Sequence, residues 1–135
     1  MNINVIEENM KLVTTGIDHL NLEVFNLVET IQFYKTLFGF EIRKNQSDQN
    51  SAIIGNDFIK LCLYEVEGFT KYEKKGYHHF GFYIENFDEI LAKCEEMDLH
   101  IYYGGVLKWE NSESIYIQDP NGYEIELSKN YGGGI

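Results

Sequence analysis

The chain has 135 residues, 44% of them hydrophobic and 15% aromatic, so it can form one folded domain with a true hydrophobic core. Its net charge of −11, from 22 acidic and 11 basic residues, argues against nucleic acid and anionic membranes as partners, because both are bound through clustered cations. Two cysteines are too few for a disulfide scaffold and fit a reducing cytoplasm, and no apolar run approaches the length of a membrane span.

The pattern along the chain predicts a single domain between two polar ends. Residues 1–15 are predicted to be an N-terminal arm, residues 16–128 the domain, and residues 129–135 a C-terminal tail. Within the domain, residues 17–25 alternate between apolar and polar side chains, which indicates a half-buried strand. A helix capped by Asn26 and ended by Gly39 should follow, and then strands at residues 40–44, 51–54 and 58–66.

The second half of the domain repeats the first after a shift of sixty residues. His19 falls on His79 and Asn26 on Asn86, so the repeat predicts a strand at 79–84 and a helix capped by Asn86. It then predicts a strand at 99–103, a loop at 104–112, and strands at 114–118 and 123–128. The expected fold class is α+β, with two β-α-β-β-β units (16–66 and 77–128) forming a mixed-sheet cup with helices outside.

The last two strands are joined by the turn Asp119-Pro120-Asn121-Gly122. Proline presets φ at the second turn position, and glycine takes a positive φ without strain. Beyond the turn, Ile125 and Leu127 point to one face of the strand and Glu126 to the other. A carboxylate on the inner face of a sheet needs a cation or a hydrogen-bond donor.

The repeat also predicts which polar side chains meet. Ile59-Lys60-Leu61 is placed in the last strand of the first unit, as Ile125-Glu126-Leu127 is in the second. If a pseudo-two-fold relates the units, four side chains converge on the floor of the cup, namely His19, Lys60, His79 and Glu126. Two imidazoles and one carboxylate are a facial ligand set for one divalent metal (Mn, Fe, Ni, Co or Zn), and they leave positions open for substrate.

These residues resemble the vicinal oxygen chelate superfamily, also called the glyoxalase/bleomycin resistance/dioxygenase superfamily. The resemblance covers residues 16–128. It rests on His19 in a strand before a Phe-Tyr helix, on His79 in His-x-Gly-Phe-x-Ile, and on Asp-Pro-Asn-Gly-x-x-x-Glu ending at Glu126. It implies a metal on His19, His79 and Glu126 that chelates two neighbouring oxygens of a small substrate, in a lyase or isomerase. It also implies a homodimer, often with each site built from two chains.

The chain departs from some members of this family. Members similar to glyoxalase I carry a fourth metal ligand, which is usually acidic. The repeat assigns Lys60 to that position, and a protonated lysine cannot coordinate a metal. Lys60 is therefore a candidate base, a cation that steadies a substrate oxygen, or a salt-bridge partner of Glu126. Residues 109–116 are similar to fosfomycin-resistance thiol transferases. A metal-free binding protein of the bleomycin-resistance type is the further alternative.

The remaining side chains of the expected cup fall into two groups. The predicted substrate-binding residues are Asn21, Cys62, Tyr64, Tyr83, Trp109 and Tyr116. His78 is expected to point away from the site, and Glu23 and Glu124 are expected to be solvated strand-edge charges. Cys62 and Cys94 are expected to be inert thiols.

Overall fold

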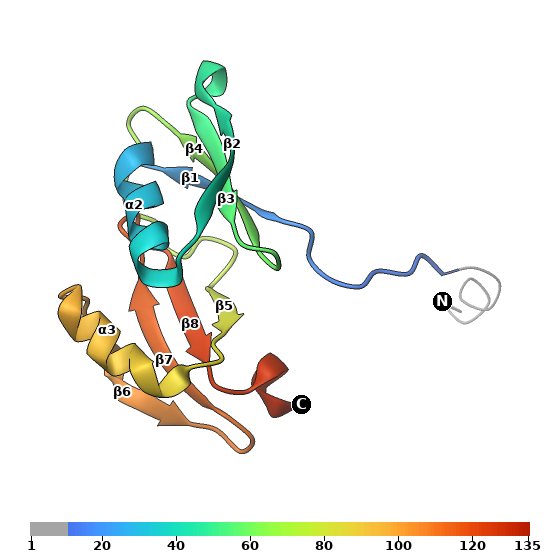
Figure 1. Ribbon diagram of the computed structural model, residues 1–135, viewed down its shortest axis with the longest axis vertical. Helices are drawn as coiled ribbons and strands as arrows, with labels where there is room; N and C mark the ends of the chain where they lie inside the picture. Colours follow the sequence, from blue (N-terminus) through green and yellow to red (C-terminus); the bar gives the residue numbers. More distant parts are fainter. Residues whose placement is uncertain (1–10) are drawn as a thin grey trace.

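A computed structural model of the chain describes residues 11–135 and consists of two units with the same order of elements (Figure 1). The first ten residues of the predicted N-terminal arm lie outside the described part. The first unit contains β1 (Leu20–Val24), α2 (Leu27–Phe38), β2 (Glu41–Gln46), β3 (Ser51–Gly55) and β4 (Lys60–Glu65). The second contains β5 (Phe80–Tyr83), α3 (Ile90–Glu96), β6 (Tyr102–Lys108), β7 (Glu113–Gln118) and β8 (Glu124–Ser128).

Each unit forms one open four-stranded mixed sheet. The strand orders are β1-β4-β3-β2 and β5-β8-β7-β6, so the two sheets have equivalent topologies. In both sheets the first strand runs parallel to the last, and the other pairs are antiparallel. The predicted α+β fold with two β-α-β-β-β units is thus confirmed. Among residues 11–135, no helix is both long and apolar enough to cross a membrane.

Local sequence signals explain the ends of α2. The Asn26 side chain accepts a hydrogen bond from the Glu29 backbone N–H at 2.8 Å, as expected of an N-cap. Gly39 ends the helix with a φ of 72°, and its N–H bonds the Lys35 carbonyl. Both predicted helix ends are therefore confirmed.

The second unit differs from its predicted local structure at two places. The side chain of Asn86 makes no capping hydrogen bond to the backbone. Its amide instead donates to the Glu89 side chain, and a 3-10 turn at Phe87–Glu89 precedes α3. The stretch 104–112 was expected to be a loop, yet β6 runs through Gly104 and Gly105 to Lys108. A bulge between Tyr102 and Leu107 accommodates this glycine pair, which explains why strand periodicity is lost there.

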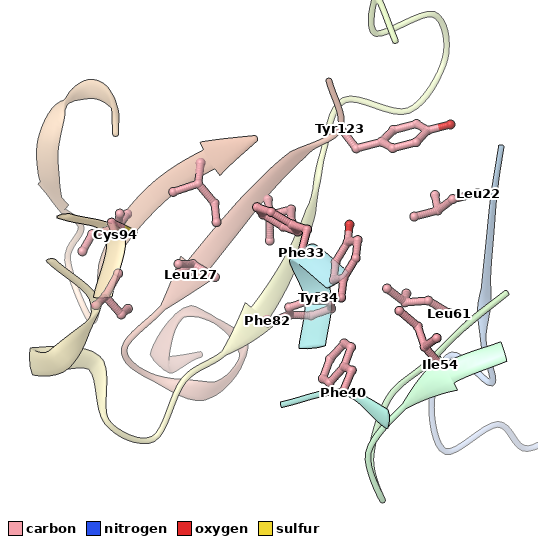
Figure 2. Close-up of a cluster of buried hydrophobic side chains, with 14 of the residues drawn as sticks. Leu22, Phe33, Tyr34, Phe40, Ile54, Leu61, Phe82, Cys94, Tyr123 and Leu127 are labelled. Atoms are coloured by element: carbon pink, nitrogen blue, oxygen red, sulfur yellow. The ribbon is translucent and has the colours of Figure 1, made fainter. Parts of the chain in front are cut away.

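The hydrophobic core lies between the two sheets, where α2 packs against both (Figure 1). In Figure 2, Phe33 and Tyr34 of α2 lie between first-sheet residues such as Leu22 and the second-sheet residue Phe82. The rings of Phe38 and Phe82 meet edge to face, with centroids 5.1 Å apart. The helix thus covers the apolar faces, and the polar faces of the sheets point away from this core.

The Asp-Pro-Asn-Gly turn fastens the second unit to the first. Asn121 is buried, accepts a hydrogen bond from the Phe25 N–H at 2.8 Å and donates one to Thr30 at 3.1 Å. Asp119 accepts a bond from the Tyr34 hydroxyl at 2.8 Å. Gly122 has the positive φ predicted for it, 89°. The turn therefore holds the two sheets in place as well as joining two strands.

Candidate metal centre

The second sheet brings together two of the three predicted metal ligands. His79 directly precedes β5, and Glu126 lies on the neighbouring strand β8, opposite Gly81. His79 Nε2 and Glu126 Oε1 are 2.9 Å apart, and both side chains are largely but not fully buried. An imidazole and a carboxylate therefore face each other on the polar face of this sheet.

Two neighbouring strands hold Glu126 in place. Ser114 of β7 donates a hydrogen bond to Glu126 Oε2 at 2.6 Å, and the Trp109 indole N–H donates to Ser114 at 3.0 Å. Tyr116 lies directly opposite Glu126 in the ladder, and its ring meets His79 edge to face. Burial raises the pKa of the Glu126 carboxyl, but hydrogen bonds from Ser114, Tyr116 and His79 outweigh it and hold that pKa below its ordinary value. Glu126 is thus kept as an oriented carboxylate.

Glu124 is not the solvated charge expected from its place on the strand. Its side chain is only 1% exposed, because it lies on the same face as Glu126 and beneath the linker between the units. Lys74 of that linker contacts its Oε1 at 2.9 Å, and the Tyr103 hydroxyl donates to the same atom. Burial raises the pKa of Glu124, but the bonds from Tyr103 and Lys74 and the charges of Lys74 and His79 keep it below its ordinary value.

The expectation that His78 points away from the site is also wrong. Although the side chain is exposed, its Nδ1 lies 2.8 Å from Nδ1 of His79. His78, His79 and Glu124 are the one group of His, Cys, Asp or Glu side chains within residues 11–135 whose ligand atoms all lie within 4.8 Å of one another. The sequence could have indicated Glu124, because it lies two residues before Glu126 and therefore on the same face of the strand. No local sequence signal indicates Lys74 or Tyr103.

The predicted site residues of the first unit lie on or next to the first sheet. His19 is half-exposed and its Nδ1 contacts Asp18 at 2.7 Å. Asn21 pairs with Cys62 across β1 and β4, and Tyr64 pairs with Glu23, so these side chains share one face. Lys60 is exposed at the start of β4. Within one chain, His19 therefore lies outside the group formed by His78, His79 and Glu124, and Glu126 contacts His79 instead of Lys60.

The ladder register corrects the matching of the two repeats. Leu20 pairs with Leu61, and Phe80 pairs with Ile125, so the position equivalent to Glu126 is Cys62 and the position equivalent to Glu124 is Lys60. The sequence match of Lys60 with Glu126 was wrong by two residues, because it relied on strand alternation, which a slip of two residues leaves unchanged. Burial raises the pKa of the Cys62 thiol, and so does the nearby charge of Asp18.

Two of the predicted substrate-binding residues, Tyr83 and Trp109, are partly exposed. Trp109 reaches the site only through its hydrogen bond to Ser114. Tyr83 lies on the Gly81 face of β5, farther along the strand, where its ring contacts Tyr131. Of the predicted residues, the structure therefore joins His79, Glu126, Tyr116 and Trp109 into one network.

Comparison with known proteins agrees with this fold. Residues 16–127 match the family model of the Glyoxalase/Bleomycin resistance protein/Dioxygenase superfamily. The chain belongs to this superfamily.

Two relatives and one solved structure of the same fold show what the chain is similar to. The chain is 29% identical over 115 residues to the metallothiol transferase FosB of Staphylococcus epidermidis, which covers 83% of this chain and 81% of that protein. It is 28% identical over 140 residues to a manganese-dependent 2,3-dihydroxybiphenyl 1,2-dioxygenase of Geobacillus genomosp. 3, covering 97% of this chain but only 44% of the relative. The crystal structure of the fosfomycin resistance protein FosX of Listeria monocytogenes superposes with a TM-score of 0.73 at 18% identity, over 91% of this chain and 100% of that one.

Proposed function

We propose that the chain is a divalent-metal-dependent enzyme of the glyoxalase/bleomycin resistance/dioxygenase type, with His19, His79 and Glu126 as the metal ligands. The observation that carries the proposal is the pairing of His79 Nε2 with Glu126 Oε1 at 2.9 Å. Two ligands at right angles, each about 2.1 Å from one metal, lie about 3.0 Å apart, so this pair already has the spacing of neighbouring ligands. The lowered pKa of Glu126 favours the ionised form that a metal needs.

The third ligand, His19, would come from a second copy of the chain. His19 lies on the polar face of the first sheet, and the His79–Glu126 pair lies on the polar face of the second. Apolar side chains of the first unit that remain exposed include Ile17, Phe25, Val28, Ile42 and Phe58. A homodimer that covers such surface and apposes the two polar faces would complete the ligand set. We place this dimer in the cytoplasm, in keeping with two free thiols.

The proposed reaction is a lyase or isomerase step on a small molecule with two vicinal oxygens. A bound metal, drawn from Mn, Fe, Ni, Co or Zn, would act as a Lewis acid toward those oxygens. Burial and the bond to Glu126 raise the pKa of Tyr116, so its phenol stays protonated and can donate a hydrogen bond beside His79. Lys60 supplies a cation, or as free amine a base, on the opposing face, and the expected pocket wall is Asn21, Cys62, Tyr64, Tyr83 and Trp109.

A second candidate is a thiol transferase of the fosfomycin-resistance type, and the similarity to FosB supports it. Such a reaction on a phosphonate needs cations near the metal. Lys60 and Lys44 are cations that the first sheet offers on the proposed site face, because Lys44 pairs with Ile53 and Ile53 pairs with Cys62. The remaining alternative, a metal-free binding protein, would leave the oriented His79–Glu126 pair without a role.

The test combines metal analysis with a substrate panel. Protein loaded in turn with Mn, Fe, Ni, Co and Zn is assayed with methylglyoxal and thiols, with fosfomycin and thiols, and with catechols under oxygen. We expect turnover in one arm, its loss in Glu126→Gln, and its retention in Glu110→Gln, an exposed matched control. Lys60→Ala, compared with Lys35→Ala at an exposed position of α2, tests the role of Lys60. Turnover undiminished in Glu126→Gln, or metal content equal in wild type and His79→Ala, would overturn the proposal.

A further inference from the structure

One oxygen of the buried Glu124 carboxylate has no partner. Oε1 receives Lys74 and Tyr103, whereas Oε2 is the one buried side-chain polar atom within residues 11–135 that makes no hydrogen bond. The Glu124 side chain is 1% exposed, so water does not reach this oxygen freely. A buried carboxylate oxygen is stable only when a donor or a cation compensates the lost hydration.

Two imidazole nitrogens face this oxygen. Glu124 Oε2 lies 3.6 Å from Nδ1 of His79 and 3.8 Å from Nδ1 of His78. The two nitrogens lie 2.8 Å from each other. Neither imidazole is close enough to satisfy Oε2 by a hydrogen bond, yet all three atoms surround one small space.

The size of that space matches a metal ion. A circle through three atoms separated by 2.8, 3.6 and 3.8 Å has a radius of about 2.0 Å. Zinc binds imidazole nitrogen and carboxylate oxygen at about 2.0–2.2 Å, so an ion close to the plane of the three atoms would have ordinary bond lengths to all of them. His78 is the exposed member of the three, so an ion would enter from its side.

Neighbouring side chains fix the orientation of the Glu124 carboxylate. Lys74 and Tyr103 occupy Oε1 and hold Glu124 so that Oε2 is directed toward the histidines. Each imidazole nitrogen that binds an ion must be unprotonated, and the ion would replace the contact between the two Nδ1 atoms. With two imidazoles and one carboxylate so close, the donor set suits Zn²⁺ or Co²⁺ better than Mg²⁺ or Ca²⁺.

We propose that His78 Nδ1, His79 Nδ1 and Glu124 Oε2 form a divalent metal site of the Zn²⁺ type within a single chain. It differs from the site of the proposed function, which would use Nε2 of His79, Glu126 and His19. His79 lies between the two sites and offers one nitrogen to each. The inference rests on the geometry of the second unit alone, so it does not depend on the proposed function or on a dimer.

The test removes the other site first. In Glu126→Gln, Co²⁺ is titrated under equilibrium dialysis, and its visible absorption is recorded. We expect one tightly bound Co²⁺ per chain, with the intense bands of a four-coordinate ion. Adding His78→Ala should weaken this binding by more than the roughly 10–100-fold that is typical of losing a residue that only supports a ligand. His78 is exposed, so this variant should fold, and circular dichroism will verify it.

His100→Ala in the same Glu126→Gln background is the matched control, because His100 is an exposed histidine elsewhere in the second unit. It should leave both the Co²⁺ affinity and the spectrum unchanged. Equal Co²⁺ binding with and without His78, or no tight binding in Glu126→Gln, would overturn the inference. Neither result would bear on the proposed function, which is decided by turnover in the wild type and in Glu126→Gln.

Discussion

The polar faces of the two sheets have the same strand order but very different degrees of organisation. In the second unit, Glu126 is held by His79 and Ser114, and Glu124 is almost fully buried. In the first unit, His19 is half-exposed with an exposed Asp18 as its partner, and Lys60 is exposed. The two units thus share the same strand topology, but in the described part of the chain only the second unit has an ordered polar network on its polar face.

This contrast indicates how a complete site could be built. A preorganised half keeps a carboxylate and an imidazole in place before any ligand arrives, which reduces the ordering that binding requires. The other half then needs to supply only one exposed imidazole. The following predictions test whether the two halves truly play these unequal roles.

The largest expected effect is on metal binding. Glu126→Gln and His19→Ala should each lower the affinity for Mn²⁺ by more than the roughly 10–100-fold that is typical of losing a residue that only supports a ligand, because each removes a proposed ligand. Equilibrium dialysis with atomic absorption measures this. An unchanged affinity in His19→Ala would reduce the site to the second unit alone.

A smaller effect is expected where the two units join. Asn121→Ala removes a buried amide that bonds Phe25 and Thr30, and it should lower the free energy of unfolding by about 2–3 kcal/mol, since buried partners are left unsatisfied. Urea denaturation measures the loss. Asn45→Ala, on the exposed strand β2, is the control and should stay within about 0.5 kcal/mol of wild type. If both variants lose the same amount, the turn does not fasten the units.

The unequal order of the two halves should also be visible without metal. Ser114→Ala removes a fully buried hydroxyl that bonds Glu126 and Trp109, and should cost about 1–3 kcal/mol of stability. His19→Ala removes an exposed side chain and should change stability by less than about 0.5 kcal/mol. Both values come from urea denaturation in the presence of a chelator. A larger loss in His19→Ala than in Ser114→Ala would reverse the comparison.

The smallest effect concerns acid. The folded chain lowers the pKa of both Glu124 and Glu126, so their contribution to stability is complete above about pH 4.3, the unfolded value, and is lost as the pH falls through the folded values. In metal-free protein, Glu124→Gln/Glu126→Gln should therefore flatten the fall of unfolding free energy below about pH 4.3. Glu110→Gln should not. An unaltered pH slope in the double variant would show that these carboxylates are not stabilised by the fold.

Much of the fold follows from the sequence, because its signals are local. The alternation before Asn26, the cap itself and Gly39 all specify geometry within a few residues, and the sixty-residue repeat specifies the second unit. The His79–Glu126 pair could be predicted for the same reason, since strand alternation and parallel pairing place both on one face. The ligand role of these residues stays a prediction.

Other features depend on contacts that no local pattern contains. Glu124 is buried because Lys74 and Tyr103, 50 and 21 residues away, cover and bond it. The equivalence of Cys62 with Glu126 follows from the ladder register, which strand alternation alone does not distinguish from a register two residues away. His19 and His79 precede strands of different sheets, which is a property of the topology of the whole chain.

The central claim, that each site joins His19 of one copy to His79 and Glu126 of another, is tested most directly by mixing two defective chains. Both carry His78→Ala, so that only the proposed catalytic site can bind metal; one also carries His19→Ala and the other Glu126→Gln. After unfolding and refolding together, random pairing makes half of the dimers mixed, each with one intact site, so about a quarter of the wild-type metal content and turnover should return. If the mixture stays as inactive and metal-free as its components, the shared site is contradicted.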